Sequence, residues 1–390
     1  RVGPANMLTP SHFFEHEACL QANIWGSTPV NLTKPLRDDI RASVDASTYS
    51  NQTPLEESTK QKVRRLAAHC AAYRGAVPKL ALLQLASTLI PLAAIVAAMF
   101  MTVRDHYWAT LLLAIPAGGL LVRVFIIQHD CGHGSFFASR TANEWTGRAM
   151  SLLTMAPYSL WKREHAQHHA TSGNLDKRGI GDIDTMTVDE YRALSALGKL
   201  RYRLYRNPLF LFGFGVPAYF LIIQRLPWLH GLPARESWKS VMGLNLGLVA
   251  FYAPFVYFFG LSDTVFVVWP MVHLASAAGG WLFFVQHQFE ETRWDHAGEW
   301  DFQVAALLGS SFYDLPKVLN WFTGNIGLHH IHHLNSMIPN YRLQACLNAS
   351  PELKELNHLT LWESFKCARL KLWDEKNRRL IRFDELPQSG

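Results

Sequence analysis

The sequence is poor in charged residues and in the motifs of several common protein classes. Charged residues make up 17% of its 390 residues, against roughly 25% in soluble domains. The five cysteines include no C-x-x-C pair, so we expect reduced thiols facing the cytoplasm and no disulfide framework. The net charge of +6 forms no basic stripe, which argues against nucleic-acid binding. H-E-x-x-H is absent, which argues against a membrane zinc protease, and we expect no cleavable signal peptide.

Apolar residues, in contrast, reach 49% and gather in a few long runs. The run from Leu80 to Val103 would form about 36 Å of helix, which is enough to cross a bilayer. Only Arg104-Asp105-His106 separates it from the next run, and Leu261-Ser262-Asp263 joins a second pair. The sequence therefore predicts an all-α, multi-pass integral membrane protein with four transmembrane helices in two hairpins. The predicted spans are about 80–103, 107–128, 241–260 and 264–286.

The polar parts of the chain divide it into three predicted regions. Residues 1–78 form an N-terminal segment with a basic helix over 56–76, and residues 79–345 form the membrane domain. Residues 346–390 are predicted to form an amphipathic helix, because Thr360 and Glu363 have capping-box spacing and apolar residues follow at helical intervals up to Leu372. The apolar stretch 209–224 is short and broken by proline, so we expect it to be interfacial or re-entrant.

Two hairpins place both termini and the polar stretch 128–240 on the same side of the bilayer. Lys and Arg flank the spans on that side, whereas both opposite links are nearly free of them. The positive-inside rule then predicts that this side is cytoplasmic and touches anionic headgroups, with the polar parts forming a helical cap.

Histidines recur at helical spacing just beyond the apolar runs. Side chains three or four residues apart share one face of a helix, whereas His330 lies about 100° away from His329 and is left out. His287 ends the fourth span and faces the same compartment, which makes it a ninth candidate. The other eight candidates are His129, His133, His165, His168, His169, His329, His332 and His333.

Nine imidazoles exceed the needs of one metal ion, because a tetrahedral zinc uses four protein ligands at most. Two metals would each receive four or five nitrogens and keep positions open for dioxygen. Zinc cannot change its redox state, and a buried apolar substrate requires oxidation of an unactivated carbon, so we predict two iron ions. A histidine-rich metal transporter remains an alternative, but ion paths need ionisable residues inside spans, where only His273 and Arg123 occur.

Three carboxylates lie near the histidines in the sequence. Asp130 and Glu164 adjoin candidate ligands and are candidates to orient an imidazole N–H, although the sequence favours the interpretation that they are ordinary surface carboxylates. Asp182 lies in Gly181-Asp182-Ile183-Asp184, where we expect it to cap or turn the chain.

The motifs HDCGHGSFF, HAQHHATSGN and GLHHIHHLNSMIPNY resemble those of the membrane fatty acid desaturases, and most closely those of the acyl-lipid delta-12 (omega-6) and omega-3 group. The resemblance covers roughly residues 80–345. It implies that the nine histidines hold two irons. It also implies a reaction in which dioxygen and two electrons create a cis double bond in a fatty acyl chain, with the delta-12 type favoured. A hydroxylase, acetylenase or other oxygenase built on the same scaffold is the alternative.

Two departures from the wider family affect the expected cofactors and partners. Animal acyl-CoA members carry an Asn one turn before the ninth histidine, where this chain has Phe283; Asn325 is the candidate replacement. No His-Pro-Gly-Gly haem segment is present, so the electrons should come from a separate ferredoxin or small b-type cytochrome. The acyl group could be carried on a lipid, an acyl-carrier protein or coenzyme A, and the sequence assigns no substrate-binding residue.

Overall fold

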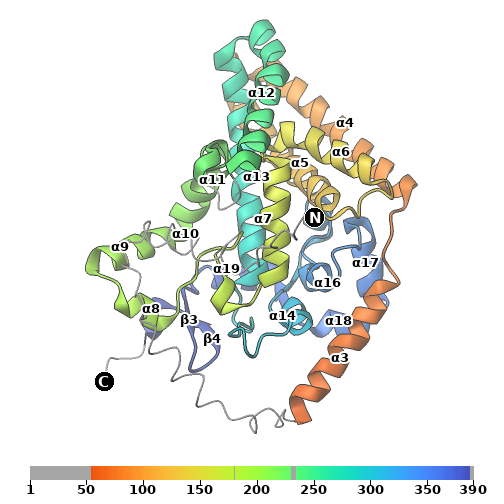
Figure 1. The fold of residues 1–390 in the computed structure, drawn as a ribbon. Helices are drawn as coiled ribbons and strands as arrows, with labels where there is room; N and C mark the ends of the chain where they lie inside the picture. The colour runs from red at the N-terminus through yellow and green to blue at the C-terminus, as the bar shows by residue number, and fades with distance from the viewer. Residues whose placement is uncertain (1–53, 180, 230–233, 387–390) are drawn as a thin grey trace, which may run out of the picture.

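The computed structural model describes residues 54–179, 181–229 and 234–386 of the chain. Most of these residues are helical, and four long helices coincide with the predicted spans (Figure 1). They are α4 (Pro78–Thr102), α5 (Tyr107–His133), α12 (Ala234–Phe259) and α13 (Leu261–His287). α5 runs five residues beyond its predicted end at 128, so the first histidine motif is a continuation of the second apolar helix.

A fifth segment, Pro208–Arg225, is also long and apolar enough to cross a membrane. It is not one regular helix, because α10 (Pro208–Phe210) gives way to a π-helical turn, η4 (Leu211–Gly215), and then to α11 (Val216–Leu221) and η5 (Ile223–Arg225). The described residues therefore contain five candidate membrane spans, and four of them are the spans predicted from the sequence.

Helix α5 is the centre of the bundle and packs against α4, α13 and α6 (Arg140–Thr154). Its middle is buried among apolar side chains of the neighbouring helices. Gly118 allows α13 to come close, since a Cβ at this position would lie 3.1 Å from the Leu274 Cβ and 3.3 Å from the Met271 carbonyl oxygen. This close packing fixes the relative positions of the histidine-bearing ends of α5 and α13.

A second apolar core lies beneath the bundle. Residues of α3 such as Leu66 and Cys70 pack there against Leu307, Ile331 and Cys346. The prediction of a helix over 56–76 is confirmed in α3, although that helix ends earlier, at Ala71. The elements around this core are α3 (Pro54–Ala71), α14 (Phe302–Leu308), α16 (His329–Leu334), α17 (Asn340–Asn348) and α18 (Pro351–Glu355).

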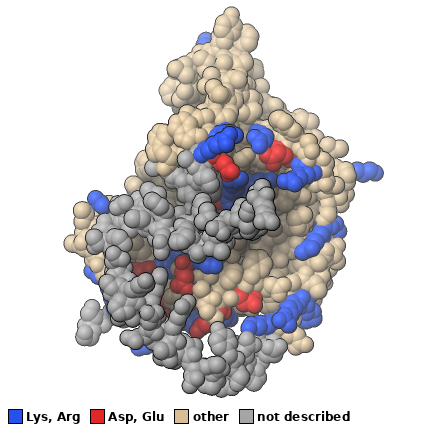
Figure 2. Space-filling model, in the orientation of Figure 1, with Lys and Arg blue, Asp and Glu red and all other residues tan. Residues whose placement is uncertain are grey.

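Short elements connect the bundle to this lower layer. Figure 2 shows that the projecting end of the molecule, where α12 lies, carries almost no charged side chains, whereas Lys, Arg, Asp and Glu gather on the wider part below it. The connecting elements are α7 (Tyr158–Thr171), η3 (Leu175–Lys177), α8 (Val188–Ala193), α9 (Ala196–Tyr205), η6 (Pro227–Leu229), α15 (Lys317–Phe322) and η7 (Phe383–Glu385).

The C-terminal region differs from the prediction of one amphipathic helix. The capping box at Thr360 is confirmed, but its helix, α19, covers only Leu361–Cys367. The helical repeat ends there because Leu372 enters a strand and pairs with Ile381. The protein is therefore not purely α-helical. In the described part of the chain the strands form two pairs, a parallel one of β1 (Phe312–Asp314) with β2 (His358–Thr360) and an antiparallel one of β3 (Leu372–Asp374) with β4 (Arg379–Ile381).

Candidate metal centre

Four helices bring the nine predicted histidines to one end of the bundle. α5 contributes two of them from its last two turns, α13 contributes its final residue, and the short helices α7 and α16 contribute three each. The nine side chains form two groups, and within each group the candidate ligand nitrogens all lie within 4.8 Å of one another. The first group is His129, His133, His165, His169 and His332; the second is His168, His287, His329 and His333.

The two groups do not follow the three sequence motifs, because α7 and α16 each contribute to both. Adjacent residues of a helix point about 100° apart. His168 therefore joins the second group while His169 joins the first, and His333 and His332 divide in the same way. The adjacent histidines of the second and third motifs thus belong to different groups.

The hydrogen bonds of the second group indicate that its nitrogens are arranged to bind a cation. His168 Nδ1 lies 2.5 Å from Asp182 Oδ1, and His287 Nδ1 lies 3.2 Å from the Gly309 carbonyl oxygen. Both Nδ1 atoms therefore carry the proton, which leaves a lone pair on each Nε2. These two Nε2 atoms are only 3.1 Å apart. Two lone pairs facing each other at this distance repel unless a cation lies between them.

The first group contains a buried nitrogen that points to the same conclusion. His129 donates from Nδ1 to Asp130 Oδ1 at 3.0 Å, so its Nε2 has a lone pair. That Nε2 is buried and has no hydrogen-bond partner in the described part of the chain. The other carboxylate oxygen of Asp130 accepts from the backbone and side-chain nitrogens of Asn340 at 2.6 and 2.8 Å. Asp130 thus joins the first and third motifs, and its predicted contact with an imidazole is present.

Burial keeps five of the candidate ligands on α7 and α16 neutral. Loss of solvation, followed by the electrostatic effect of neighbouring histidines, lowers the pKa of His165, His169, His329, His332 and His333 well below the ordinary value. A neutral imidazole is the form that binds a metal. No carboxylate or thiolate joins either group among the described residues, and such all-nitrogen sites suit iron, copper, nickel or zinc. The residues present therefore fit two transition-metal ions.

Asp182 is the contact that sequence reasoning missed, because we expected it only to cap or turn the chain. Its loop approaches α7 through Gly181, which has a φ of +71° and would place a Cβ 3.2 Å from the His168 Cβ and 3.0 Å from the Glu164 carbonyl oxygen. Only glycine combines this backbone with so close an approach. The Gly-Asp pair is the available signal in the sequence, but its 14-residue distance from His168 gave no reason to pair the two.

Other predicted residues have different surroundings. Glu164 Oε2 lies 3.5 Å from the Tyr219 hydroxyl oxygen, and its role toward an imidazole stays a prediction. Asn325 has a left-handed backbone (φ +58°), and its amide donates to the Asn340 carbonyl oxygen at 3.4 Å. This contact does not support its suggested role near a metal.

Phe283 and His330 also touch the site without joining either group. The Phe283 ring packs 5.1 Å from the His168 ring and 5.4 Å from the His287 ring, so an apolar side chain borders the second group. His330 is fully buried and its Nε2 lies 2.9 Å from the Leu353 carbonyl oxygen. This contact turns His330 away from both groups.

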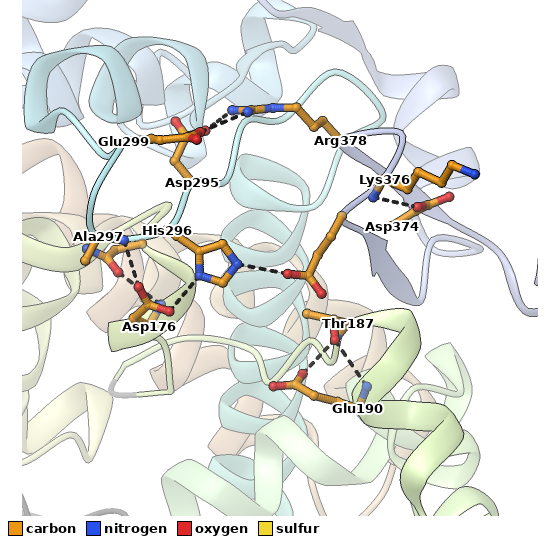
Figure 3. A network of polar contacts seen from close by, with 12 residues as sticks. Asp176, Thr187, Glu190, Asp295, His296, Ala297, Glu299, Asp374, Lys376 and Arg378 are labelled. Carbon is orange, nitrogen blue, oxygen red and sulfur yellow. Dashed lines mark hydrogen bonds and ion pairs between the residues drawn. The ribbon is translucent and has the colours of Figure 1, made fainter. Parts of the chain in front are cut away.

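A polar network around His296 and Arg378 lies outside both histidine groups (Figure 3). His296 Nδ1 lies 2.7 Å from Asp176 Oδ1, and its Nε2 lies 2.9 Å from Glu375 Oε1. These two carboxylates raise the pKa of His296. Arg378 pairs with both Asp295 and Glu299. The network joins the loop that follows α7, the loop that follows α13 and the β3–β4 hairpin.

A bundle of long apolar helices that ends in two all-histidine groups defines a membrane-type protein with two sites that could each hold a metal ion. The family model described as fatty acid desaturase matches residues 106–364. The chain therefore belongs to the fatty acid desaturase family, whose members are oxidoreductases.

Curated relatives agree with this assignment. The chain is 40% identical to a fatty acid desaturase of Bacillus subtilis over 84% of its own length and 93% of the relative. It is 28% identical to the sn-1 acyl-lipid omega-3 desaturase (ferredoxin) of Synechocystis, over 64% of this chain and 70% of that one. It is 25% identical to the sn-1 oleoyl-lipid 12-desaturase of the same organism, over 74% of this chain and 79% of that one.

Proposed function

We propose that this protein is a membrane-bound acyl desaturase that introduces a cis double bond into a fatty acyl chain at a di-iron centre. The observation that carries the proposal is the division of nine buried or partly buried histidines into a group of five and a group of four on shared helices. When bound, two irons would supply the oxidising chemistry that uses dioxygen and two electrons to remove two hydrogens from adjacent methylenes.

The residues of the chain have distinct tasks in this proposal. The nine imidazoles, which are the ligands predicted from the sequence, hold the metals through ring nitrogens. Asp130, Asp182 and the Gly309 carbonyl each fix one imidazole N–H and so determine which nitrogen faces the metal. Phe283 excludes water from one side of the second group.

The delta-12 (omega-6) position, an acyl-lipid substrate and a separate electron carrier are part of the proposal. Relatives named oleoyl-lipid 12-desaturase support the position, and a relative whose name includes ferredoxin supports the carrier. The omega-3 position is the competing one, because an omega-3 desaturase is among the relatives. A free acyl-CoA or acyl-carrier-protein substrate is the competing form of the acyl group.

We further propose four spans, with both termini and the histidines in the cytoplasm. The contacts of Pro208–Arg225 support a segment that enters the bilayer without crossing it. Phe212 packs 5.4 Å from Phe284, and Phe220 packs 6.1 Å from Phe125. Both contacts lie within about one helical turn of the histidine-bearing ends of α13 and α5, so the segment stays near that level. An impermeant thiol reagent should label Asp189→Cys only from the cytoplasmic side, and Asp105→Cys and Ser262→Cys only from the other. Labelling of Ser262→Cys from the cytoplasmic side would mean that Pro208–Arg225 crosses the bilayer and would contradict four spans.

Product analysis tests the proposed function directly. Expressed in a host with a suitable electron donor, the protein should add double bonds to host fatty acids, and gas chromatography should place them at the delta-12 position. His332→Ala should abolish these products and lower the metal content of the purified protein. His330→Gln is the matched control, because His330 lies in the same helix and outside both groups, and it should keep both activity and metal. Hydroxylated products, or double bonds formed by His332→Ala, would refute the proposal.

A further inference from the structure

Helix α9 (Ala196–Tyr205) has an inverted distribution of polarity. Its inward face is polar: Tyr202 donates its hydroxyl to the Lys371 carbonyl oxygen at 2.6 Å and is fully buried. Its outward face is apolar, since Leu197, Leu200 and Leu204 are 52–56% exposed. At 100° per residue these three leucines lie within about 60° of one another. A stripe of leucines facing away from the protein requires a partner other than water.

The chain passes from α9 directly into the apolar segment that packs on the bundle. Asn207 caps the start of α10, where its side-chain oxygen accepts from the backbone nitrogens of Leu209 and Phe210. Leu209 and Phe214 are strongly exposed. Next to them, Phe212 packs 5.2 Å from Trp281 of α13, which is part of a candidate membrane span. This exposed apolar segment therefore lies against a candidate span, and Figure 1 shows α10 and α11 beside α13.

Helix α19 reaches the same part of α13 from the other end of the chain. Its Phe365 ring lies 5.4 Å from the Trp281 ring, and Phe365 itself is exposed. Trp362, one turn away, is 78% exposed. Exposed tryptophan beside a transmembrane helix is typical of the headgroup level of a bilayer.

Cationic side chains border these apolar surfaces. Arg201 is exposed beside the leucine stripe, and on its other side Arg203 donates from Nε to the Tyr191 hydroxyl at 2.7 Å. Lys366 is exposed on α19. An apolar face with flanking Lys and Arg fits a bilayer surface that contains anionic headgroups.

We propose that α9, the start of Pro208–Arg225 and α19 lie in the cytoplasmic surface of the bilayer, with the leucines of α9 and Trp362 inserted among anionic lipids. This proposal rests on the proposed function as a membrane-bound enzyme, and it states which residues of the chain lie at the surface of the bilayer. It also ties that surface to the candidate metal centre. Arg206, one residue past α9, is buried and donates to Thr185 Oγ1 at 2.8 Å and to Gln288 Oε1 at 3.0 Å, and Gln288 directly follows His287. Insertion of α9 thus holds the second histidine group at a fixed depth.

Nitroxide labels measure this depth in nanodiscs of phosphatidylcholine and phosphatidylglycerol. The four described cysteines are buried, and Cys19→Ser removes the fifth. Labels at Leu200→Cys and Trp362→Cys are the tests. Asp189→Cys, on the neighbouring helix α8, is the water control, because the Asp189 side chain is 83% exposed. Ile90→Cys, in the middle of α4, is the lipid control.

At both test positions we expect collisions with oxygen to exceed collisions with a nickel chelate, as at Ile90→Cys, and the reverse at Asp189→Cys. The ratio of oxygen collisions to nickel-chelate collisions at each test position should lie between the ratios at the two controls, because the headgroup layer lies between water and the bilayer centre. A ratio equal to that of Asp189→Cys at either position overturns the proposal. Protection from both reagents also overturns it, since a second protein surface would then cover the site. A water-like ratio at Ile90→Cys would instead refute the proposed spans.

Discussion

The contact between Asp182 and His168 leads to a prediction that separates the two histidine groups. Asp182→Asn keeps the size of the side chain but removes its charge, and the His168 Nδ1–H then donates to a neutral amide. Asp182 touches only the second group, through its contact of 2.5 Å. We therefore expect this substitution to weaken one metal site and leave the other intact.

The size of the effect follows from the kind of hydrogen bond that is lost. A hydrogen bond to a charged group contributes about 1.5–3 kcal/mol, and one between neutral groups contributes about 0.5–1.5 kcal/mol. The substitution therefore costs about 1–1.5 kcal/mol, or about tenfold in metal affinity. This value lies at the lower end of the range of about 10–100-fold known for residues that orient metal ligands, which is reasonable because the Asp182 side chain is 20% exposed.

Metal titration of the purified protein, in competition with a chelator, measures both affinities. In Asp182→Asn, one binding step should weaken about tenfold while the other keeps its wild-type affinity. Asp130→Asn should weaken the opposite step, because Asp130 contacts His129 of the first group. Asp184→Asn is the matched control, since Asp184 is another carboxylate of the same loop. An equal loss at both steps in Asp182→Asn, or an unchanged affinity, would refute the reasoning.

Two further predictions concern the stability of the fold. Gly118→Val should lower the free energy of unfolding by about 1–3 kcal/mol through overpacking. Gly279→Ala is the control and should have no such effect, because a Cβ at Gly279 has no neighbour within 4 Å. Equal melting temperatures of the two variants in detergent would contradict the close approach of α5 and α13. Burial lowers the pKa of His330 from its ordinary value of 6.5 to about 4, so the unfolded chain takes up the proton first as the pH falls. As the pH falls from 6.5 to 4, the free energy of unfolding of the wild type should therefore decrease by up to about 3 kcal/mol relative to that of His330→Gln. Parallel curves of unfolding free energy against pH for the two proteins would argue against a buried neutral His330.

Helical periodicity and apolar runs predicted the helices well, because both features act within one segment. The capping box at Thr360 and the long helix that ends at His287 are local in this sense. The C-terminal helix was extended too far for the opposite reason. Leu372 continues the helical interval, but its pairing with Ile381 depends on a strand that periodicity in one segment cannot detect.

The same distinction explains the result at the candidate metal centre. Spacing within a motif placed His165, His168 and His169 near one another, but their division between two groups depends on how α7 faces α5 and α13. Asp182 and the Gly309 carbonyl were not found because each reaches its histidine from a distant loop. A backbone carbonyl, moreover, has no signature in the sequence.

Helices α7 and α16 each supply histidines to both groups, so the two sites cannot change independently. Rotation of α16 by a few tens of degrees would move His332 out of the first group and His329 and His333 out of the second at the same time. One contact that resists this rotation is the hydrogen bond between His330 Nε2 and the Leu353 carbonyl oxygen, on the face of α16 turned away from both groups. A histidine that binds no metal therefore fixes the orientation of three that do in the proposed centre. His330→Ala, which removes this contact, should weaken both metal affinities together, whereas Asp182→Asn weakens only one; His330→Gln keeps an N–H donor for the Leu353 carbonyl and should leave both affinities unchanged.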